Sequence, residues 1–363
     1  MRRSRDRVGG YRGRRTLTDM LTILALVLAV LVALLLGGLL LGQRYIVYTD
    51  DGFRLDLPFF QKEPDSAEAA PGDISMVERP SASSEESEPD PDPEPEPEAF
   101  ALSAVQLPLE TVLDGTAAQQ LEQTGANGLI LEMKTAEGTL NWVSQQPLAV
   151  SLGVNGQDPA VNEALRRWNQ GEVYTVARVY CFRDNTAPYQ RNNLALRASY
   201  GNWRDELGLR WMNPSSEEAC SYLAELCGEL AELGFDEILL ECGSYPTGGN
   251  QEAITSDTPQ GRGPAVEQFL TQVRQAVESY GTQVSLRVEP AVLAGEDVLS
   301  GLTAETLDSL ADRIWTEPQG LEAGQNLLDQ SARESEGRLV CLRTVLETEE
   351  AGAQAVLGGD EVS

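Results

Sequence analysis

Short apolar runs alternate with longer amphipathic segments over the region from Ala99 to Ser363. The apolar runs have the length and composition of buried strands, and the segments between them carry apolar residues at helical spacing. Such alternation is typical of a parallel sheet whose strands are connected by helices. The expected strands are Val105–Val112, Gly128–Lys134, Val173–Phe182, Glu237–Cys242, Gln283–Glu289, Arg313–Glu317 and Leu339–Val345, with a short eighth at Ala353–Leu357.

Strand–helix units in this number either close into a barrel or form an open, doubly wound sheet. Residues 99–363 are close in length to the ~250 residues of a typical eight-stranded barrel. No expected strand is followed by a glycine-rich phosphate loop of the type G-x-G-x-x-G or G-x-x-x-x-G-K-[ST]. The sequence therefore predicts a (β/α)8, TIM-like barrel and no cofactor. Its C-terminal part is expected to be shortened, because little room for a full helix remains after Val345.

Two of the expected helices are marked by signals at their ends. Ser215 and Glu218 have the spacing of a capping box, and Gly234 is a typical residue just beyond a helix end. A second helix is expected from Pro264 to Tyr280, where valine and leucine recur at helical spacing. We expect these apolar residues to lie in the core and not at a functional site.

The N-terminal part does not have the composition of a globular domain. Residues 20–43 contain no charged side chain and, at 1.5 Å per residue, are long enough to cross the ~30 Å hydrocarbon core of a bilayer. Seven arginines precede this segment within residues 1–19. By the positive-inside rule, residues 1–19 are expected in the cytoplasm, 20–43 as a single transmembrane anchor, and everything after Arg44 outside the cytoplasm.

Two further segments separate the expected anchor from the barrel. Within residues 44–60, Arg44–Thr49 and Phe53–Leu57 flank an Asp-Gly turn signal, which predicts a β-hairpin. Residues 61–98 contain thirteen acidic side chains and a run of alternating proline and acidic residues. A segment of this composition cannot bury enough apolar surface to fold, and it is expected to be a disordered, extended linker.

The charge of the chain is strongly polarised. The net charge is −30, yet residues 1–42 carry seven arginines against Asp6 and Asp19, so the rest of the chain carries −35. A field of that sign repels phosphate backbones. Nucleic acid is therefore not an expected partner of the outer domain.

The chain contains no histidine. This absence excludes a Ser-His-Asp triad, a Cys-His pair and every histidine-containing zinc site, and no metal site is expected. Only carboxylates are abundant enough to be expected as an acid–base pair. The cysteines are too few and too scattered for a disulfide framework and are expected to be buried free thiols: Cys181, Cys220, Cys227, Cys242 and Cys341.

Charged residues gather at the ends of the expected strands. In a (β/α)8 barrel the C-terminal strand ends surround the active-site mouth. Alternation along Gln283–Glu289 puts Val284, Leu286 and Val288 on the helix side and Ser285, Arg287 and Glu289 inside the barrel. By the same rule Glu132 and Lys134 share one face. The candidates at or near these ends are Glu132, Lys134, Arg178, Asp184, Glu241, Glu289 and Glu317.

Carboxylates that converge at one mouth are what glycoside hydrolysis requires, since one protonates the leaving oxygen and another attacks or activates water. Sugars also bind to aromatic faces, for which Trp211 and Tyr245 are candidates. Structural alternatives remain open at this stage. Glu289 is equally suited to a salt bridge with an arginine, Glu317 to a solvated rim, and the aromatic residues to anchoring loops.

Several motifs in a fixed order carry a resemblance to a known family. The chain resembles a family of glycoside-hydrolase-like barrels of bacterial envelope proteins (DUF4015-like). The family has an Ala-Arg strand that leads into Phe-Lys-Asp, which is here Ala177-Arg178 and Phe182-Arg183-Asp184. It continues with Trp-Arg-Asp, a glycine and Trp-x-Asp/Asn-Pro, which are here Trp203-Arg204-Asp205, Gly208 and Trp211-Met212-Asn213-Pro214. Its Leu-Gly-Phe-Asp-Glu-Ile motif is here Leu233-Gly234-Phe235-Asp236-Glu237-Ile238.

The resemblance implies a barrel that acts on envelope or other polysaccharide, with Glu241 as general acid and Glu132 as second carboxylate. Lys134 and Arg178 would orient them. Two features favour the alternative of a catalytically degenerate barrel that binds glycan or an envelope protein: the loss of an arginine and the shortened C-terminal part. The family's Asp-Tyr-x-Arg-Phe-Pro is here Glu-Cys-Gly-Ser-Tyr-Pro, so Ser244 replaces that arginine. The aspartate of this motif and that of the family's Asp-Val-Lys are here the glutamates Glu241 and Glu132.

Overall fold

The computed structural model describes residues 46–49, 52–55, 101–347 and 352–358. The chain divides into two units, Met1–Pro89 and Asp90–Ser363. In the first, β1 (Ile46–Thr49) pairs antiparallel with β2 (Gly52–Leu55). The expected cytoplasmic tail, anchor and linker lie outside the described residues. Among the helices that are described, none combines the length and apolar character needed to span a membrane.

The second unit is a closed barrel of eight parallel strands, which confirms the predicted fold class. Neighbouring strands follow the chain order, and β12 closes the barrel on β3 through the pair Ala355–Ala104. The strands are β3 (Ser103–Gln106), β4 (Gly128–Lys134), β5 (Tyr174–Tyr180), β8 (Glu237–Glu241), β9 (Gln283–Arg287), β10 (Arg313–Thr316), β11 (Leu339–Leu342) and β12 (Gln354–Val356).

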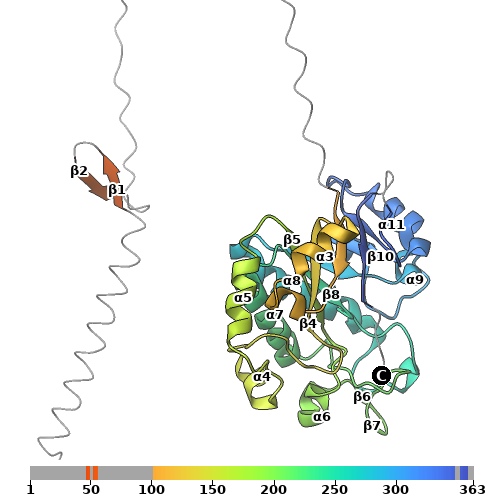
Figure 1. The fold of residues 1–363 in the computed structure, drawn as a ribbon. Helices are drawn as coiled ribbons and strands as arrows, with labels where there is room; N and C mark the ends of the chain where they lie inside the picture. Colours follow the sequence, from red (N-terminus) through yellow and green to blue (C-terminus); the bar gives the residue numbers. More distant parts are fainter. Residues whose placement is uncertain (1–45, 50–51, 56–100, 348–351, 359–363) are drawn as a thin grey trace, which may run out of the picture. The chain divides into compact units, whose positions relative to one another are not determined.

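Helices connect the strands and surround the barrel (Figure 1). They are α2 (Glu110–Leu113), α3 (Ala117–Thr124), α4 (Pro147–Leu152), α5 (Ala160–Trp168), α6 (Ala187–Gln190), α7 (Glu217–Glu232), α8 (Pro259–Val277), α9 (Pro290–Leu293), α10 (Ala304–Leu310) and α11 (Leu321–Leu328). Short 3-10 turns cover Asn192–Leu194, Gln251–Ala253, Glu278–Tyr280 and Pro318–Gly320. The described residues between β11 and β12 hold no helix, in line with the expected shortening.

The longest connection at the mouth is the one between β5 and α7. It contains α6 and a small antiparallel pair, β6 (Arg197–Ala198) with β7 (Gly201–Asn202), which lie at the same end of the barrel in Figure 1. The connection after β8 is bound to it, since Thr255 donates its backbone N–H to Arg197 O at 2.8 Å. These two connections build one wall of the barrel mouth.

Apolar side chains form two separate clusters, as the alternation along each strand requires. The larger cluster fills the layer between strands and helices and contains Val284, Leu286 and Val288, as predicted from the sequence. The smaller cluster lies inside the barrel, with Ile130 and Leu239 among its members. This interior layer separates two groups of charged side chains, one at each end of the barrel.

Several expected strands end a few residues earlier in the structure, and three boundaries are wrong for an identifiable local reason. The strand expected at Val105–Val112 ends at Gln106, because Pro108 begins a turn that leads into α2. The capping serine of α7 is Ser216, whose Oγ accepts from Ala219 N. Ser215 instead bonds the hydroxyl of Tyr245 at 2.6 Å. The helix expected from Pro264 begins at Pro259, and Pro264 lies within it.

All five cysteines are free, and all but Cys242 are buried. Burial raises the pKa of Cys220, Cys227 and Cys242 to about 12. The thiols therefore stay protonated near neutral pH. The prediction of buried free thiols is confirmed for four of the five cysteines, and Cys242 is only partly buried.

Candidate active site

Charged side chains from the ends of five neighbouring strands meet inside the barrel at its C-terminal end. Arg178 lies near the end of β5, Glu241 ends β8 and Arg287 ends β9, while Glu132 comes from β4 and Glu317 follows β10. Salt bridges join these five residues into one continuous group, the mouth cluster. The convergence expected from the strand ends is thus found in the structure.

Glu241 is the centre of the mouth cluster. Its Oε1 accepts from Arg178 Nε at 2.8 Å, and its Oε2 lies 3.2 Å from Arg287 Nη1. The residue is only 2 % exposed. Charge-assisted bonds of this kind are the strongest that side chains form, so Glu241 is fixed in orientation between two guanidinium groups.

Glu132 approaches the same arginine from the neighbouring strand. Its Oε2 lies 3.7 Å from Arg178 Nη1, and its side chain is 29 % exposed. The two carboxylates that the sequence predicts as a pair therefore face one guanidinium group. They differ in access, since Glu132 reaches solvent and Glu241 does not.

Arg287 links Glu241 to a third carboxylate. Its Nη2 donates to Glu317 Oε1 at 2.7 Å. Burial would lower the pKa of Arg287, but the charge of Glu241 and the bonds to Glu317 outweigh it and raise this pKa above its ordinary value. The other oxygen of Glu317 is buried and accepts no hydrogen bond within the described part of the chain.

Sequence reasoning missed two polar residues of this group. Arg178 donates to the hydroxyl of Tyr180 at 2.8 Å and to Gln106 Oε1 at 3.0 Å. Tyr180 is the second residue after Arg178 on β5 and therefore shares its interior face. Strand parity, applied to β5 as it was to β9, would have identified Tyr180. Nothing in the sequence marks Gln106, because the strand that carries it was expected to continue through it.

The expectation that Lys134 lies beside Glu132 is not met. The pairing of β4 with β5 shifts register between these two residues, which indicates a bulge. Lys134 is fully buried, and its Nζ binds Asp184 Oδ2 at 2.8 Å and Tyr180 O at 2.9 Å. Asp184 in turn accepts from the backbone N–H groups that begin α6. This pair fastens the wall of the mouth to the strands.

The two expected aromatic sugar contacts lie mostly inside the protein. Tyr245 is 1 % exposed, and the guanidinium of Arg262 covers its ring at 4.8 Å. Trp211 is 7 % exposed and donates its indole N–H to Asp205 Oδ2 at 3.1 Å. Tyr245 is thus a loop anchor, whereas an edge of Trp211 remains at the surface. Contact of either with a substrate stays a prediction.

Two hollows border the strand ends. The mouth hollow, of about 720 Å³, is lined by Arg178, Arg287 and Glu317 together with residues 342–347. The side hollow, of about 200 Å³, is lined by Cys242, Glu289, Trp211 and the wall of the mouth. Glu289 is exposed and is not part of the mouth cluster. Its expected role and that of Glu317 stay predictions.

Backbone strain marks the junction of Glu241 with the side hollow. Cys242 has φ +50, a left-handed conformation that a cysteine rarely adopts. No other non-glycine residue in the described ranges has a positive φ. Such conformations concentrate at functional sites, where the surrounding structure holds them.

A second charged group at the opposite end of the barrel was also missed. Glu237 accepts from Trp315 Nε1 at 2.9 Å and from the Tyr174 hydroxyl at 3.0 Å, and it forms an ion pair with Arg313. Arg313 also donates to Gln283 Oε1 at 2.7 Å. Burial, followed by the charge of Glu237, raises the pKa of Tyr174. We call these five residues the base cluster.

The mouth is not arranged as a metal site. Among the described residues, no group of three or more Asp, Glu, Cys or His side chains has a geometry that could hold a metal ion. The arginines of the mouth cluster occupy the positions between carboxylates. What the arrangement offers is carboxylate chemistry with fixed positive charges beside it.

Comparison with known families and structures gives one match by sequence. Residues 104–313 match the family described as "Putative glycosyl hydrolase domain". This range begins in β3 and ends at the start of β10, so it contains Glu132, Arg178, Glu241 and Arg287. No match was found among curated proteins.

Solved structures of similar fold share little sequence with the chain. A hypothetical protein from Ruminiclostridium thermocellum is 22 % identical with a TM-score of 0.43, over 50 % of this chain and 96 % of the other. The PgaB (BpsB) glycoside hydrolase domain from Bordetella bronchiseptica is 14 % identical with a TM-score of 0.45, over 67 % and 84 %. A class V chitinase from Pseudomonas fluorescens is 12 % identical with a TM-score of 0.40, over 67 % and 68 %.

Proposed function

The chain belongs to the "Putative glycosyl hydrolase domain" family, and on this basis we propose that its barrel mouth cleaves glycosidic bonds in an envelope or other polysaccharide. The observation that carries the proposal is the meeting of Glu132 and Glu241 at one guanidinium group, that of Arg178. Two carboxylates at one C-terminal mouth are the minimum that glycoside hydrolysis needs.

The contacts suggest how the two carboxylates divide the work. A proton on Glu241 would cost one of its two ion pairs, so Glu241 suits the role of the ionised carboxylate. Glu132 is accessible and makes a longer contact with Arg178, so it suits proton transfer. This assignment reverses the roles expected from the resemblance.

A pair of isosteric variants tests both the activity and the division of roles. The full chain is screened for hydrolysis of cell-wall and plant glycans, and then Glu132→Gln and Glu241→Gln are compared on the best substrate. Both variants are expected to lose about a thousandfold in kcat, as each removes one of the two essential groups. Unchanged hydrolysis by Glu241→Gln would refute the proposal.

The leaving group distinguishes the two roles. An aryl glycoside with a dinitrophenyl leaving group needs no proton, so Glu132→Gln is expected to cleave it almost as fast as the wild type. Glu241→Gln is expected to stay inactive on it. The opposite pattern would restore the original assignment of Glu241 as general acid.

One observation favours a second candidate function, a degenerate barrel that binds glycan without cleaving it. Glu241 is almost inaccessible beneath its two arginines, so substrate would have to displace Arg287 to reach it. This candidate would be selected by glycan binding that persists in the double variant Glu132→Gln/Glu241→Gln, with no turnover by the wild type.

We propose further that residues 20–43 anchor the chain in the cell membrane, with the barrel outside the cytoplasm. The support is the lack of charge over 20–43 and the arginines that precede it. The full chain is expected in the membrane fraction after alkaline carbonate washing. Arginine at Leu31 and Leu35 is expected to release it, since charges at the bilayer centre are costly. Release of the unaltered chain by the same wash would contradict the anchor.

A further inference from the structure

The mouth hollow and the side hollow are lined by residues close in sequence to one ion pair, Glu241–Arg287. The mouth hollow is lined by Arg178 and Arg287, the two partners of Glu241. The side hollow is lined by Cys242, the residue that follows Glu241, and by Glu289, two residues beyond Arg287. Both hollows therefore lie near the C-terminal strand ends that carry this pair.

The side hollow has the construction of a sugar-binding position. Trp211, Cys242 and Pro246 supply apolar surface, and polar or charged groups come from Arg183, Asp205, Glu206, Thr247 and Glu289. Aromatic and apolar surface beside convergent polar groups is typical of sites that orient small ligands. Trp211 is also held in place, because Asp205 accepts from its indole N–H and pairs with Arg183 at 2.8 Å.

We propose that the side hollow is a second sugar subsite, and that the protein binds an oligosaccharide across the Glu241–Arg287 pair with sugar units in both hollows. The inference rests on the proposed function and deepens it. An oligosaccharide held on both sides of Glu241 is bound through its internal sugar units and not only through one terminal sugar.

The charges around the side hollow indicate the class of sugar. Arg183 is neutralised by Asp205. Glu206 and Glu289 are both exposed at the hollow, and within the described residues neither forms a salt bridge with a basic side chain. The local excess of negative charge favours amine-bearing sugars and disfavours acidic ones.

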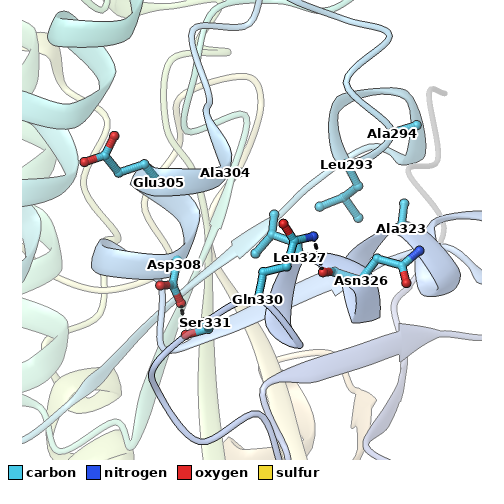
Figure 2. A pocket seen from close by; sticks show the side chains of 10 residues that line it. All are labelled: Leu293, Ala294, Ala304, Glu305, Asp308, Ala323, Asn326, Leu327, Gln330 and Ser331. Carbon is cyan, nitrogen blue, oxygen red and sulfur yellow. Dashed lines mark hydrogen bonds between the residues drawn. The ribbon is translucent and has the colours of Figure 1, made fainter.

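A third hollow shows that size alone does not mark a subsite. The outer hollow, of about 460 Å³, lies among α9, α10 and α11 and is drawn in Figure 2. Its carboxylate Asp308 accepts from Ser331 at 2.6 Å and pairs with Arg338. The hydrogen bond from Ser331 and the contact with Arg338 lower the pKa of Asp308. This hollow is separate from the strand ends and offers no aromatic side chain.

The outer hollow does provide a matched control. Glu305 is an exposed glutamate in the first turn of α10 and lines the outer hollow (Figure 2). Glu289 is an exposed glutamate just before α9, where its side chain makes no capping hydrogen bond. Replacing either by glutamine removes the same charge at an exposed position near a helix start, and neither change removes a capping hydrogen bond.

The experiment is calorimetric titration of the full chain carrying Glu241→Gln with glucosamine oligomers of two to six units and their N-acetylated counterparts. The hexamer is expected to bind about tenfold more tightly than the dimer, which corresponds to about 1.4 kcal/mol. Thr247→Trp, which fills the side hollow, is expected to remove that gain. Glu289→Gln is expected to weaken the amine-bearing hexamer about threefold, the size of an exposed charge contact. Glu305→Gln is expected to change nothing.

The outcomes separate the inference from the proposed function. Affinity that does not grow with length, or equal effects of Glu289→Gln and Glu305→Gln, would overturn the subsite even if the wild type hydrolyses glycans. Length-dependent binding without any hydrolysis would keep the subsite and overturn the enzyme. Failure of every oligomer to bind overturns the subsite, whereas the proposed function is overturned only by the hydrolysis screen of cell-wall and plant glycans. If Thr247→Trp melts within a few degrees of its parent, its effect on oligosaccharide binding is local and does not come from unfolding.

Discussion

The two ends of the barrel both hold charged side chains in the interior, but they are built differently. In the base cluster one glutamate, Glu237, faces one arginine, Arg313, and both carboxylate oxygens of Glu237 are hydrogen-bonded. In the mouth cluster three glutamates face two arginines, and Glu132, Arg287 and Glu317 each have side chains about 30 % exposed. At the base, Glu237 is fully buried and both its oxygens are bonded, whereas at the mouth the carboxylates Glu132 and Glu317 are accessible and one oxygen of Glu317 accepts no hydrogen bond among the described residues.

The difference separates structural charge from functional charge. A buried carboxylate whose two oxygens are both bonded to protein groups has no position left for a substrate, so its role is to hold the strands together. A cluster with accessible carboxylates and a strained neighbour, Cys242, can exchange a protein contact for a substrate contact. Active sites of such barrels lie at this C-terminal end. Four predictions test whether the contrast is real.

The largest effect is expected at the base. Glu237→Gln leaves the guanidinium of Arg313 buried without its counter-charge, and breaking such a pair typically costs about 3–5 kcal/mol. Urea unfolding monitored by circular dichroism measures this loss. The double variant Glu237→Leu/Arg313→Leu is expected to recover most of the stability, since no buried charge remains. A single-variant loss below about 1 kcal/mol would show that Glu237 and Arg313 are not a buried structural pair.

At the mouth the corresponding change should affect activity more than stability. Arg287→Ala frees both Glu241 and Glu317 from one guanidinium, but solvent reaches this position. Unfolding free energy is expected to fall by about 1–2 kcal/mol, and kcat/KM by about a hundredfold through misplacement of Glu241. Arg274→Ala is the control, because Arg274 pairs with Asp312 outside the mouth cluster. Equal losses of activity in both variants would remove the distinction.

Most of the barrel could be predicted from the sequence, because its strands and helices are set by apolar periodicity. Gly128–Lys134 has the predicted bounds, and Val284, Leu286 and Val288 pack on the helix side as predicted. The prediction that Glu289 lies inside the barrel is wrong, because β9 ends at Arg287 and Glu289 is exposed beyond it. Failures arose where one residue changes local geometry. Pro108 ends the first strand early, and the bulge after Glu132 sends Lys134 to Asp184. Periodicity carries no information on such single-residue events.

The candidate site was predictable in its carboxylates but not in their partners. Glu132, Glu241 and Glu317 can be identified from the sequence because each lies at the C-terminal end of an expected strand, and no distance between residues is needed. That Arg178 and Arg287 both bind Glu241 depends on the stagger between β5, β8 and β9, which no single strand encodes. For the same reason the base cluster went unnoticed, since its members come from the first half or so of four separate strands.

Alkaline pH provides a smaller test of the base. The pKa of Tyr174 is raised, first by burial and then by Glu237, so the folded state retains a proton that the unfolded state loses. The resulting stability is complete below the ordinary tyrosine pKa of about 10 and declines as pH rises beyond it, by about 1.4 kcal/mol per unit. Tyr174→Phe is expected to reduce the slope of the urea midpoint between pH 9 and 11. The raised pKa values of the cysteine thiols add a pH dependence of their own to the wild type and to Tyr174→Phe alike. Equal slopes of the urea midpoint in the two proteins would therefore count against the base cluster.

The smallest effect concerns the strain at the mouth. At Cys242, with φ +50, glycine is free of the steric cost that any Cβ brings, so Cys242→Gly is expected to be about 1 kcal/mol more stable than Cys242→Ala. Comparing the two variants cancels the loss of the thiol itself. At Cys181, on the neighbouring strand end and without a positive φ, the order is expected to reverse, because glycine there only adds freedom to the unfolded chain. Thermal melting of the four variants measures both differences. The same order at both positions would mean that Cys242 is not strained, and the mouth would lose the feature that most clearly separates it from the base.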